Sequence, residues 1–217
     1  NFTWKPWIRK GEVPEGSSVN WILGISRDSV LISNIECNKD GKYGITLSFN
    51  DDVVVIGSPN SDPGAITDSG KAYFYCSSSS GWTEYNVTAS DKAASDNFGS
   101  SVSIAKASSL STRFAVGAPN ADISSFTGSG KVYIYDVDLS FNITQDGTYL
   151  SASDKASGDK FGASIAIKSD ATRIFVGAPS ASYLSYTKPG KVYIFDSGSS
   201  TGWVRQTISG LSYLKAN

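Results

Sequence analysis

The sequence repeats itself at a constant interval, and this repetition constrains the fold more than any other feature. The tetrapeptide Val-Gly-Ala-Pro ends at Pro119 and again, 60 residues later, at Pro179, and the related Ile-Gly-Ser-Pro ends at Pro59. A Gly-Lys pair follows in phase each time, beginning at Gly70, Gly130 and Gly190. Self-similarity at a fixed period indicates that one structural unit is copied along the chain.

Each unit opens on an aromatic residue followed by glycine and then reads as four short strands. The opening pairs are Tyr43-Gly44, Phe98-Gly99 and Phe161-Gly162. The first strand, as in FGSSVSIA, alternates small polar and apolar residues, whereas the second, as in RFAVGAP, is nearly all apolar and is expected to be buried on both faces. The third, GKVYIYD, alternates again, and the fourth, WTEYNVTAS, is rich in β-formers. The predicted fold class is all-β.

Four antiparallel strands per unit, copied at constant spacing, favour blades of β-propeller type over a sandwich, which has no reason to repeat, and over a solenoid, whose repeat is shorter. We predict about 3 to 3.5 repeats of about 60 residues in one continuous repeat domain. The predicted units are an N-terminal extension or partial blade at 1–35, a degenerate blade at 36–90, a blade at 91–153, and a blade with a C-terminal strand at 154–217.

The spacing of the motifs resembles that of FG-GAP repeats, which form the propeller blades of integrin α-subunit heads and of many secreted or surface proteins. Phe98-Gly99 with Gly117-Ala118-Pro119 carries the resemblance, and so does Phe161-Gly162 with the second Gly-Ala-Pro. The runs TASDKAASDNFG and SASDKASGDKFG resemble the simpler variety found in large extracellular proteins of microbes. The resemblance covers residues 36–210. It implies that the glycine admits a neighbouring backbone, that the phenylalanine fills the wedge between blades, and that the proline ends the buried strand.

Calcium-binding versions of this repeat carry an Asp-x-Asp-x-Asp-Gly-like run between the first and second strands, because the ion needs several oxygen ligands from one tight loop. The corresponding stretches here are AKASSLSTR and IKSDATR, which share one carboxylate, Asp170, and SFNDD in the degenerate unit. None of them supplies the ligand set. We therefore expect no calcium in these blades, no other metal and no cofactor.

Four aspartates recur just before the aromatic-glycine pairs, and they are the strongest candidates for acid/base chemistry: Asp91, Asp96, Asp154 and Asp159. A glycosidase needs one carboxylate pair in a cleft rather than the same pair in every unit. We expect these side chains to cap turn amides instead. The chain has no histidine, which excludes Ser-His-Asp, Cys-His and His-zinc chemistry. We predict no catalytic residues and no enzymatic activity.

The composition favours a protein of the cell exterior. Charged residues make up 18% of the chain, and three Asn-x-Thr sequons predict N-linked glycans at Asn86, at Asn142 and at the terminal Asn1. A net charge of −1 gives no electrostatic footprint for nucleic acid, and the longest apolar run, AYFYC, is far too short to span a bilayer. We expect a secreted or cell-surface location, with neither nucleic-acid binding nor membrane insertion.

The two cysteines give conflicting signals. An even number in a secreted chain favours a disulfide between Cys37 and Cys76. In an ordinary blade, however, these positions lie on opposite rims, about 15–20 Å apart, whereas a bridge requires Cα atoms within about 7 Å. Either the degenerate unit departs from blade geometry, or each cysteine pairs elsewhere. We favour the bridge narrowly.

The loops between the second and third strands differ between units and gather on one face of a propeller, where binding sites usually lie. Their exposed aromatic candidates are Phe126, Tyr183 and Tyr186. These side chains suit partner anchors or sugar-stacking platforms, and they equally suit packing between blades or ordinary surface. The residues alone do not distinguish these roles.

Three to three-and-a-half blades do not close a ring, and open blades leave unpaired sheet edges. The absence of methionine indicates a processed product or a segment of a longer protein. Alternatively, two copies pair, or blades of successive chains stack into a filament. The aromatic N-terminal segment, residues 1–16, could add a strand to a neighbour.

Two functions from different classes follow. The first is a non-enzymatic extracellular structural or adhesive glycoprotein built of FG-GAP-like blades, whose partners are other protein chains, either copies of itself or further repeats. The alternative is a carbohydrate-binding module of a secreted protein, with the aromatic loops as platforms and glycans as ligands.

Overall fold

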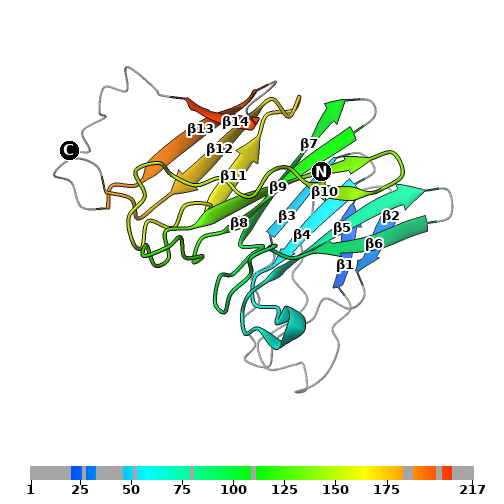
Figure 1. Ribbon diagram of the computed structural model, residues 1–217. Coiled ribbons are helices and arrows are strands. Elements are labelled where there is room, and N and C mark those ends of the chain that lie inside the picture. Colours follow the sequence, from blue (N-terminus) through cyan, green and yellow to red (C-terminus); the bar gives the residue numbers. More distant parts are fainter. Residues whose placement is uncertain are drawn as a thin grey trace, which may run out of the picture.

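The computed structural model describes residues 21–25, 28–32, 46–50, 53–78, 81–108, 111–182, 188–198 and 202–206. Within these ranges the chain consists of antiparallel strands and one short 3-10 turn, η1 (Pro63–Ala65) (Figure 1). No helix in this part of the chain is long and apolar enough to cross a membrane. The all-β prediction is therefore confirmed.

The strands form three four-stranded sheets and one hairpin, and in each sheet the spatial order follows the order along the chain. The hairpin pairs β1 (Trp21–Ile25) with β2 (Asp28–Ile32). The first blade contains β3 (Thr46–Asn50), β4 (Val53–Ser58), β5 (Lys71–Ser78) and β6 (Gly81–Val87). The second contains β7 (Ser101–Ser108), β8 (Ser111–Ala118), β9 (Lys131–Asp138) and β10 (Ile143–Gln145). The third contains β11 (Ser164–Ile167), β12 (Arg173–Ala178), β13 (Lys191–Gly198) and β14 (Gly202–Gln206).

The strand register repeats with the sequence period. Gly117 of β8 lies opposite Val132 of β9, and 60 residues later Gly177 of β12 lies opposite Val192 of β13. Because paired residues share one face of a sheet, equivalent residues of the two units point to equivalent sides. The second and third blades can therefore be compared position by position.

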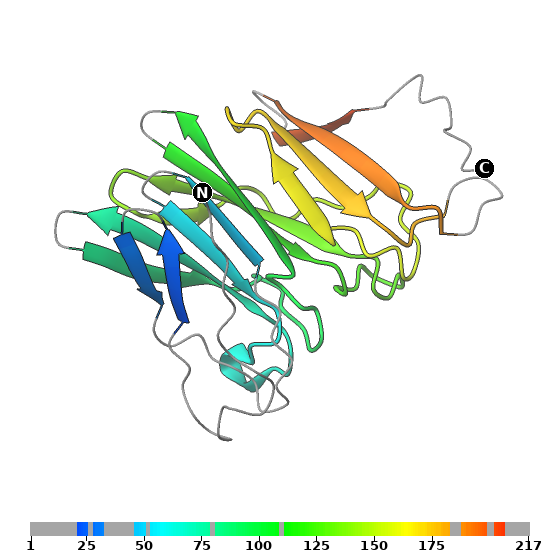
Figure 2. The ribbon, with the colours of Figure 1, turned by 180° about the vertical axis from the view of Figure 1, so that it is seen from behind.

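The three blades stand face to face, as successive blades of a propeller do (Figures 1 and 2). Strand β7, the first of the second blade, contacts β3 of the first blade and β11 of the third. The β1–β2 hairpin lies on the side of the first blade that faces away from the second (Figure 2). On that side the first blade is also buried, through Val54 and Ile56 of β4.

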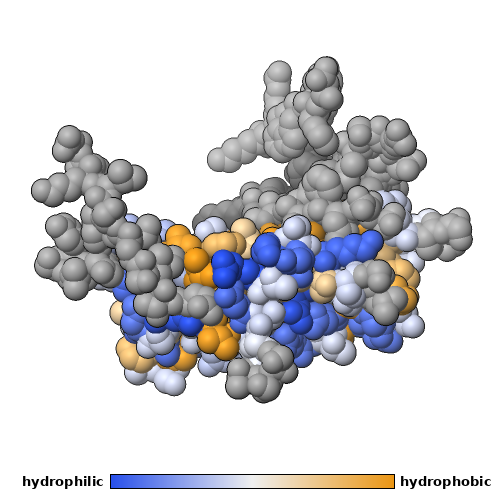
Figure 3. All heavy atoms as spheres, turned by 90° about the horizontal axis from the view of Figure 1, so that it is seen from above, coloured by the Kyte–Doolittle hydropathy of each residue, from blue (hydrophilic) through white to orange (hydrophobic). Residues whose placement is uncertain are grey.

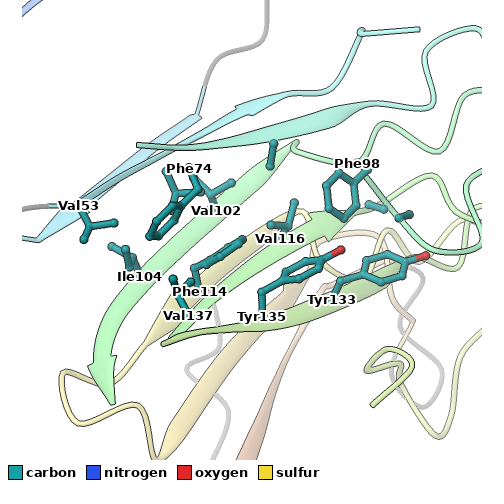
Figure 4. Packing of buried hydrophobic residues seen from close by; sticks show 14 of the residues in the cluster. Val53, Phe74, Phe98, Val102, Ile104, Phe114, Val116, Tyr133, Tyr135 and Val137 are labelled. Carbon is teal, nitrogen blue, oxygen red and sulfur yellow. The ribbon is translucent and has the colours of Figure 1, made fainter. Parts of the chain in front are cut away.

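Two apolar cores fill the spaces between the blades. In the second blade, Phe114 of β8 and Tyr135 of β9 point toward the first blade, where the Phe114 ring stacks on Phe74 with centroids 5.5 Å apart (Figure 4). Their chain neighbours Ala115 and Ile134 point the other way, into the core shared with the third blade. The second blade is thus buried on both faces because it has a neighbour on each side.

The third blade differs. Strand β12 alternates between buried and exposed residues, so the prediction that the second strand of each unit is buried on both faces is correct for β4 and for the inner part of β8 but wrong for β12. Phe175 of β12 and Val192 of β13 are exposed on the face that points away from the second blade. Within the described residues, no strand covers this face.

Of the two cysteines in the favoured bridge, Cys76 is the one that lies within the described residues. Cys76 is a free, buried thiol in β5, and its Sγ lies 3.8 Å from the carbonyl oxygen of Thr83. It pairs with Val53, at the end of the sheet where β3 finishes, whereas the chain enters β3 at the opposite end. Cys37, which precedes β3, lies outside the described residues.

Candidate functional site

The junction between successive blades is built from main-chain hydrogen bonds that recur from one unit to the next. The segment before each aromatic-glycine pair donates three backbone amides to carbonyl oxygens of the preceding blade. At the first junction the bonds run from Ser95 to Thr67 (2.8 Å), Asn97 to Asp68 (3.0 Å) and Phe98 to Ser69 (3.1 Å). At the second they run from Gly158 to Thr127 (2.8 Å), Lys160 to Gly128 (3.2 Å) and Phe161 to Ser129 (3.0 Å). The main chain thus supplies the part of the junction that recurs at both places.

The glycine of each Gly-Lys pair permits this close approach. Gly130 has a φ of +90°, and a Cβ at this position would overlap the carbonyl oxygen of Phe161 in the next blade. Gly70 stands in the same relation to Phe98. Gly162, the glycine of the aromatic pair, has a φ of +89°, and a Cβ there would lie 2.7 Å from the carbonyl oxygen of Lys131. Both glycine motifs are thus required by contacts between blades.

The phenylalanines of the aromatic-glycine pairs are fully buried in the wedges between blades, as the resemblance implied. Phe98 packs edge-on against Tyr133, with ring centroids 5.3 Å apart, and Phe161 packs in the same way against Tyr193, at 5.4 Å. Such edge-to-face pairs are favoured by the ring quadrupoles. The repeated motif therefore fills the core and does not form a binding site.

Side chains reinforce the second junction. The Ser101 hydroxyl donates to the carbonyl oxygen of Gly162 at 2.7 Å. On the outer side, Trp203 of the third blade donates its Nε1–H to Asp146 at 3.1 Å and stacks on the guanidinium of Arg113, 5.2 Å from the ring centroid. The two hydrogen bonds that Arg113 makes with Asp136, each 2.7 Å long, hold the pKa of the guanidinium above its ordinary value.

Two of the four recurring aspartates cap turns, as predicted. Asp96 accepts the amide of Ala93 at 2.8 Å, and Asp159 accepts the amide of Ala156 at 2.7 Å. Burial raises the pKa of Asp96 above its ordinary value, which the Ala93 hydrogen bond only partly offsets. These carboxylates hold the segment that leads into each aromatic-glycine pair.

The other two aspartates bond to side chains of the third strand, which the turn-capping prediction did not include. Asp91 accepts a hydrogen bond from Lys131 Nζ at 2.7 Å and one from the Tyr133 hydroxyl at 2.5 Å, and Asp154 accepts one from Lys191 at 2.9 Å. Burial acts to raise the pKa of Asp91, but the bonds from Lys131 and Tyr133 outweigh it and hold that pKa below its ordinary value.

This network ties the linker between blades to the third strand. Burial raises the pKa of Tyr133, and the hydrogen bond to Asp91 raises it further. The lysine follows the aspartate by 40 residues in one unit and 37 in the other. Sequence reasoning missed the pair, although both residues recur in each unit and the recurrence was a usable signal. All four carboxylates are thus engaged in holding the repeat together.

The aromatic loop candidates are not brought together within the described residues. Phe126 is partly exposed in a turn closed by two backbone hydrogen bonds with Ile123, of 3.0 and 3.2 Å. The ammonium of Lys155, from the next unit, lies 5.8 Å from the centroid of its ring. Tyr183 and Tyr186 lie outside the described residues. A shared aromatic platform therefore remains a prediction.

Two of the three sequon asparagines are exposed on outer strands or their connections. Asn86 is in β6, the outermost strand of the first blade, and Asn142 directly precedes β10. Asn142 donates from its side-chain amide to Asp138 at 2.9 Å. Asn1 lies outside the described residues. Both described positions leave room for a sugar without disturbing a core.

Within the described ranges, no three acidic, cysteine or histidine side chains converge in a way that would hold a metal ion. The carboxylate of Asp170 is engaged locally: it accepts the Thr172 amide at 3.0 Å and the Thr172 hydroxyl at 2.6 Å, and it pairs with Lys168. The Lys168 and Thr172 contacts hold the pKa of Asp170 well below its usual range. The absence of calcium stays a prediction.

The open face of the third blade carries a hollow of about 530 Å³, lined by Ser164, Gly177 and Gly190 among others. Figure 3 shows hydrophilic side chains across the middle of the molecule, with apolar side chains in orange toward both ends. In the second blade, the equivalent place beside Gly117 is taken by Gly162 of the third. The hollow is therefore an unfilled counterpart of a blade junction.

Comparison with known families agrees with this geometry. Residues 82–135 and 146–195 match the model of the FG-GAP repeat. No curated protein matched the chain. FG-GAP repeats are found in extracellular adhesion proteins such as integrins, and typically in extracellular or surface proteins. Each matched range contains one aromatic-glycine pair and one Gly-Ala-Pro motif, and these are the residues that form the junctions described above. The chain therefore contains FG-GAP repeats in these two ranges.

Proposed function

We propose that this chain is a non-enzymatic extracellular glycoprotein with a structural or adhesive role, which assembles through the faces and edges of its blades. The observation that carries the proposal is the repeated junction, in which three backbone hydrogen bonds and a buried phenylalanine join each blade to the next. Such a frame is stiff because it is paired through the main chain, and it ends on a face that nothing described covers.

The engagement of the recurring acids supports a non-enzymatic role. Asp91 and Asp154 are paired with lysines, and Asp96 and Asp159 bond to turn amides. A carboxylate that performs general acid or base chemistry must instead reach a substrate. We therefore assign these side chains to the construction of the frame.

The positions of the sequons support an extracellular location. Asn86 and Asn142 are exposed and lie at the outer side of the first and second blades. Glycans there would project away from the junctions and leave the loops and the open blade face free for partners. A carbohydrate-binding role for the Phe126 loop remains the alternative, and binding to a glycan array would favour it.

The test is expression of the chain in a secreting eukaryotic cell, followed by mass analysis before and after removal of N-glycans. We expect a loss of mass that includes one glycan at Asn86 and one at Asn142. Thr88→Ala and Thr144→Ala should each abolish one glycan, whereas the matched controls Thr88→Ser and Thr144→Ser, which keep the sequon, should retain it. In parallel, an antibody against the chain should label intact source cells. An unglycosylated chain and labelling confined to permeabilised cells would contradict the proposal.

A further inference from the structure

The turn between the third and fourth strands of the second blade brings an exposed leucine close to a sequon. Leu139 is 66% exposed, more than any other large hydrophobic side chain in the described part of the chain. Asn142, the first residue of the sequon Asn-Ile-Thr, follows it in the same turn. A single exposed leucine is common on protein surfaces and needs no explanation by itself. What distinguishes this one is its position beside the predicted glycan site.

The turn has a fixed shape, because the backbone and the Asp138 side chain both close it. The Phe141 amide donates to the Asp138 carbonyl oxygen at 3.0 Å, and the Asp138 amide donates to the Asn142 carbonyl oxygen at 3.2 Å. Asp138 Oδ1 also accepts the backbone amides of Ser140 at 2.8 Å and Asn142 at 2.9 Å. Leu139 is therefore held within a loop, residues 138–142, that is hydrogen-bonded at both ends.

The same aspartate orients the side-chain amide to which a sugar would be attached. Asn142 Nδ2 donates to Asp138 Oδ2 at 2.9 Å. The hydrogen bonds from Asn142 and Ser140 hold the pKa of Asp138 below its ordinary value, so this carboxylate is ionised at neutral pH and remains an acceptor. An asparagine amide has two N–H groups and keeps one of them after N-glycosylation, so the bond to Asp138 can persist. The amide then has a fixed direction relative to the turn.

The core lies on the opposite face of this hairpin. Val137 is buried between the first and second blades, and Ile143, which pairs with it, packs against the same core. Asp138 and Asn142 are the next residues toward the turn, and they point to the other face because side chains alternate along a strand. A sugar on Asn142 therefore begins outside the core, at the turn end of the hairpin.

We propose that the first N-acetylglucosamine of a glycan on Asn142 packs against Leu139 and covers it. The inference rests on the proposed function, and it assigns Leu139 as the residue that the sugar covers. The ring C–H groups and the acetyl methyl group of this sugar are apolar, and packing them on a leucine removes apolar surface from water. The sugar thus stabilises the turn that connects the third strand of the second blade to its outer strand.

The other described sequon has no such neighbour. Asn86 lies within β6 on the same face as Glu84 and Trp82, because every second residue of a strand points to the same side. Glu84 is exposed and accepts a hydrogen bond from the Tyr75 hydroxyl at 2.6 Å. Trp82 is about 13 Å further along the strand, out of contact with a single attached sugar. Asn86 is therefore a matched control within the same chain.

The test compares one sequence with and without a single sugar at Asn142. Thr3→Ala and Thr88→Ala remove the other two sequons, and the chain is expressed in a secreting cell that makes high-mannose glycans. An endoglycosidase then trims the glycan to its first N-acetylglucosamine. The unmodified form is the same sequence produced in bacteria, and both forms are kept reduced so that their cysteines are in the same state. Mass analysis establishes occupancy, and thermal unfolding gives the midpoint Tm.

We expect the single sugar to raise Tm by about 2–4 °C, the shift that one added apolar contact produces in a chain of this size. In Leu139→Ser the rise should fall below about 1 °C, because the serine offers the sugar no apolar surface. Leu139→Met keeps an apolar side chain of similar volume and should retain the rise. A single sugar at Asn86, in a Thr3→Ala and Thr144→Ala background, should change Tm by less than about 1 °C.

An equal rise in the Leu139 and Leu139→Ser chains would overturn the proposal and assign the effect to the Asp138 hydrogen bond. No rise in the occupied Leu139 chain would also overturn it, as would an equally large rise from a sugar at Asn86. These results leave secretion and the presence of the glycan unchanged, so the proposed function would stand. A secreted chain without a glycan at Asn142 would overturn both, and mass analysis distinguishes that case from the others.

Discussion

The second and third blades carry nearly the same sequence pattern and the same strand register, yet they are buried differently. In the second blade, Ala115, Val132 and Ile134 lie in a core shared with the third. In the third blade, the equivalent Phe175 and Val192 are exposed. The comparison shows that the repeat encodes a blade that can pack against another blade on either face. Each face is buried only where a neighbouring blade covers it. Substitutions at matched positions of the two blades should therefore measure how much the neighbouring blade contributes to the free energy of unfolding.

The largest difference is expected at the glycines of the Gly-Lys pairs. Gly130→Ala should cost more than about 4 kcal/mol, because the new Cβ overlaps the carbonyl oxygen of Phe161 in addition to straining a φ of +90°. Gly190→Ala has a similar φ of +80°, but its nearest atom is the Pro179 carbonyl oxygen at 3.2 Å, so about 1–2 kcal/mol is expected. Urea unfolding of both variants measures the difference. Equal costs would show that the junction contributes nothing at this position.

A lysine introduced at matched positions of the two blades should produce almost as large a difference in stability. Val132→Lys places an unpaired ammonium in the closed core and should destabilise the protein by about 3–5 kcal/mol. Val192→Lys places the same group on an exposed face and should change stability by no more than about 0.5 kcal/mol. Thermal unfolding checks both. A large cost at position 192 would mean that this face is covered in solution.

The repeated arginines provide a smaller contrast. Arg113→Ala removes two hydrogen bonds to Asp136 and the stacking partner of Trp203, and should cost about 2 kcal/mol. Arg173→Ala removes the same pair with Asp196 on the open face and should cost less than about 1 kcal/mol. The measurement is the midpoint of urea unfolding. If the two variants lower the unfolding midpoint equally, the stacked Trp203 does not strengthen the ion pair of Arg113.

The smallest effect concerns acid stability. The folded pKa values of Asp91 and Asp154 are held below the ordinary value by their lysine partners, against the opposing effect of burial. Each ionised carboxylate therefore stabilises the fold above about pH 4, and this contribution is lost as the pH falls through the folded pKa. Asp91→Asn and Asp154→Asn should each flatten the decline in stability between about pH 5 and pH 3.

The change should be greater for Asp91→Asn, because Lys131 is 8% exposed and Lys191 is 19% exposed. Stability measured at pH 7 and at pH 3.5 provides the readout. If stability falls equally with pH in the parent and Asp91→Asn chains, the ionised Asp91 carboxylate does not stabilise the fold as inferred. A larger change in acid stability for Asp154→Asn would show that the Asp154–Lys191 pair contributes more than the Asp91–Lys131 pair.

Much of the fold was predictable because the information is local and repeated. The aromatic-glycine and Gly-Ala-Pro motifs marked the strand boundaries, and alternation in stretches such as that around Tyr133 indicated strands with two different faces. The roles of Phe98 and Phe161 followed from the family resemblance. The pairing of Asp91 with Lys131 was missed, since the partners lie 40 residues apart and a turn-capping role explains an aspartate in a loop equally well.

The sequence by itself determined the unit: its period, its four strands and the residues that must be glycine or phenylalanine, because these depend on backbone conformation and on side-chain alternation within about 60 residues. Only the tertiary structure decided which faces are closed. The second blade is buried on both sides and the third on one, although both carry the same pattern, because burial depends on the position of another blade. That position is set by backbone hydrogen bonds between segments that local sequence does not connect.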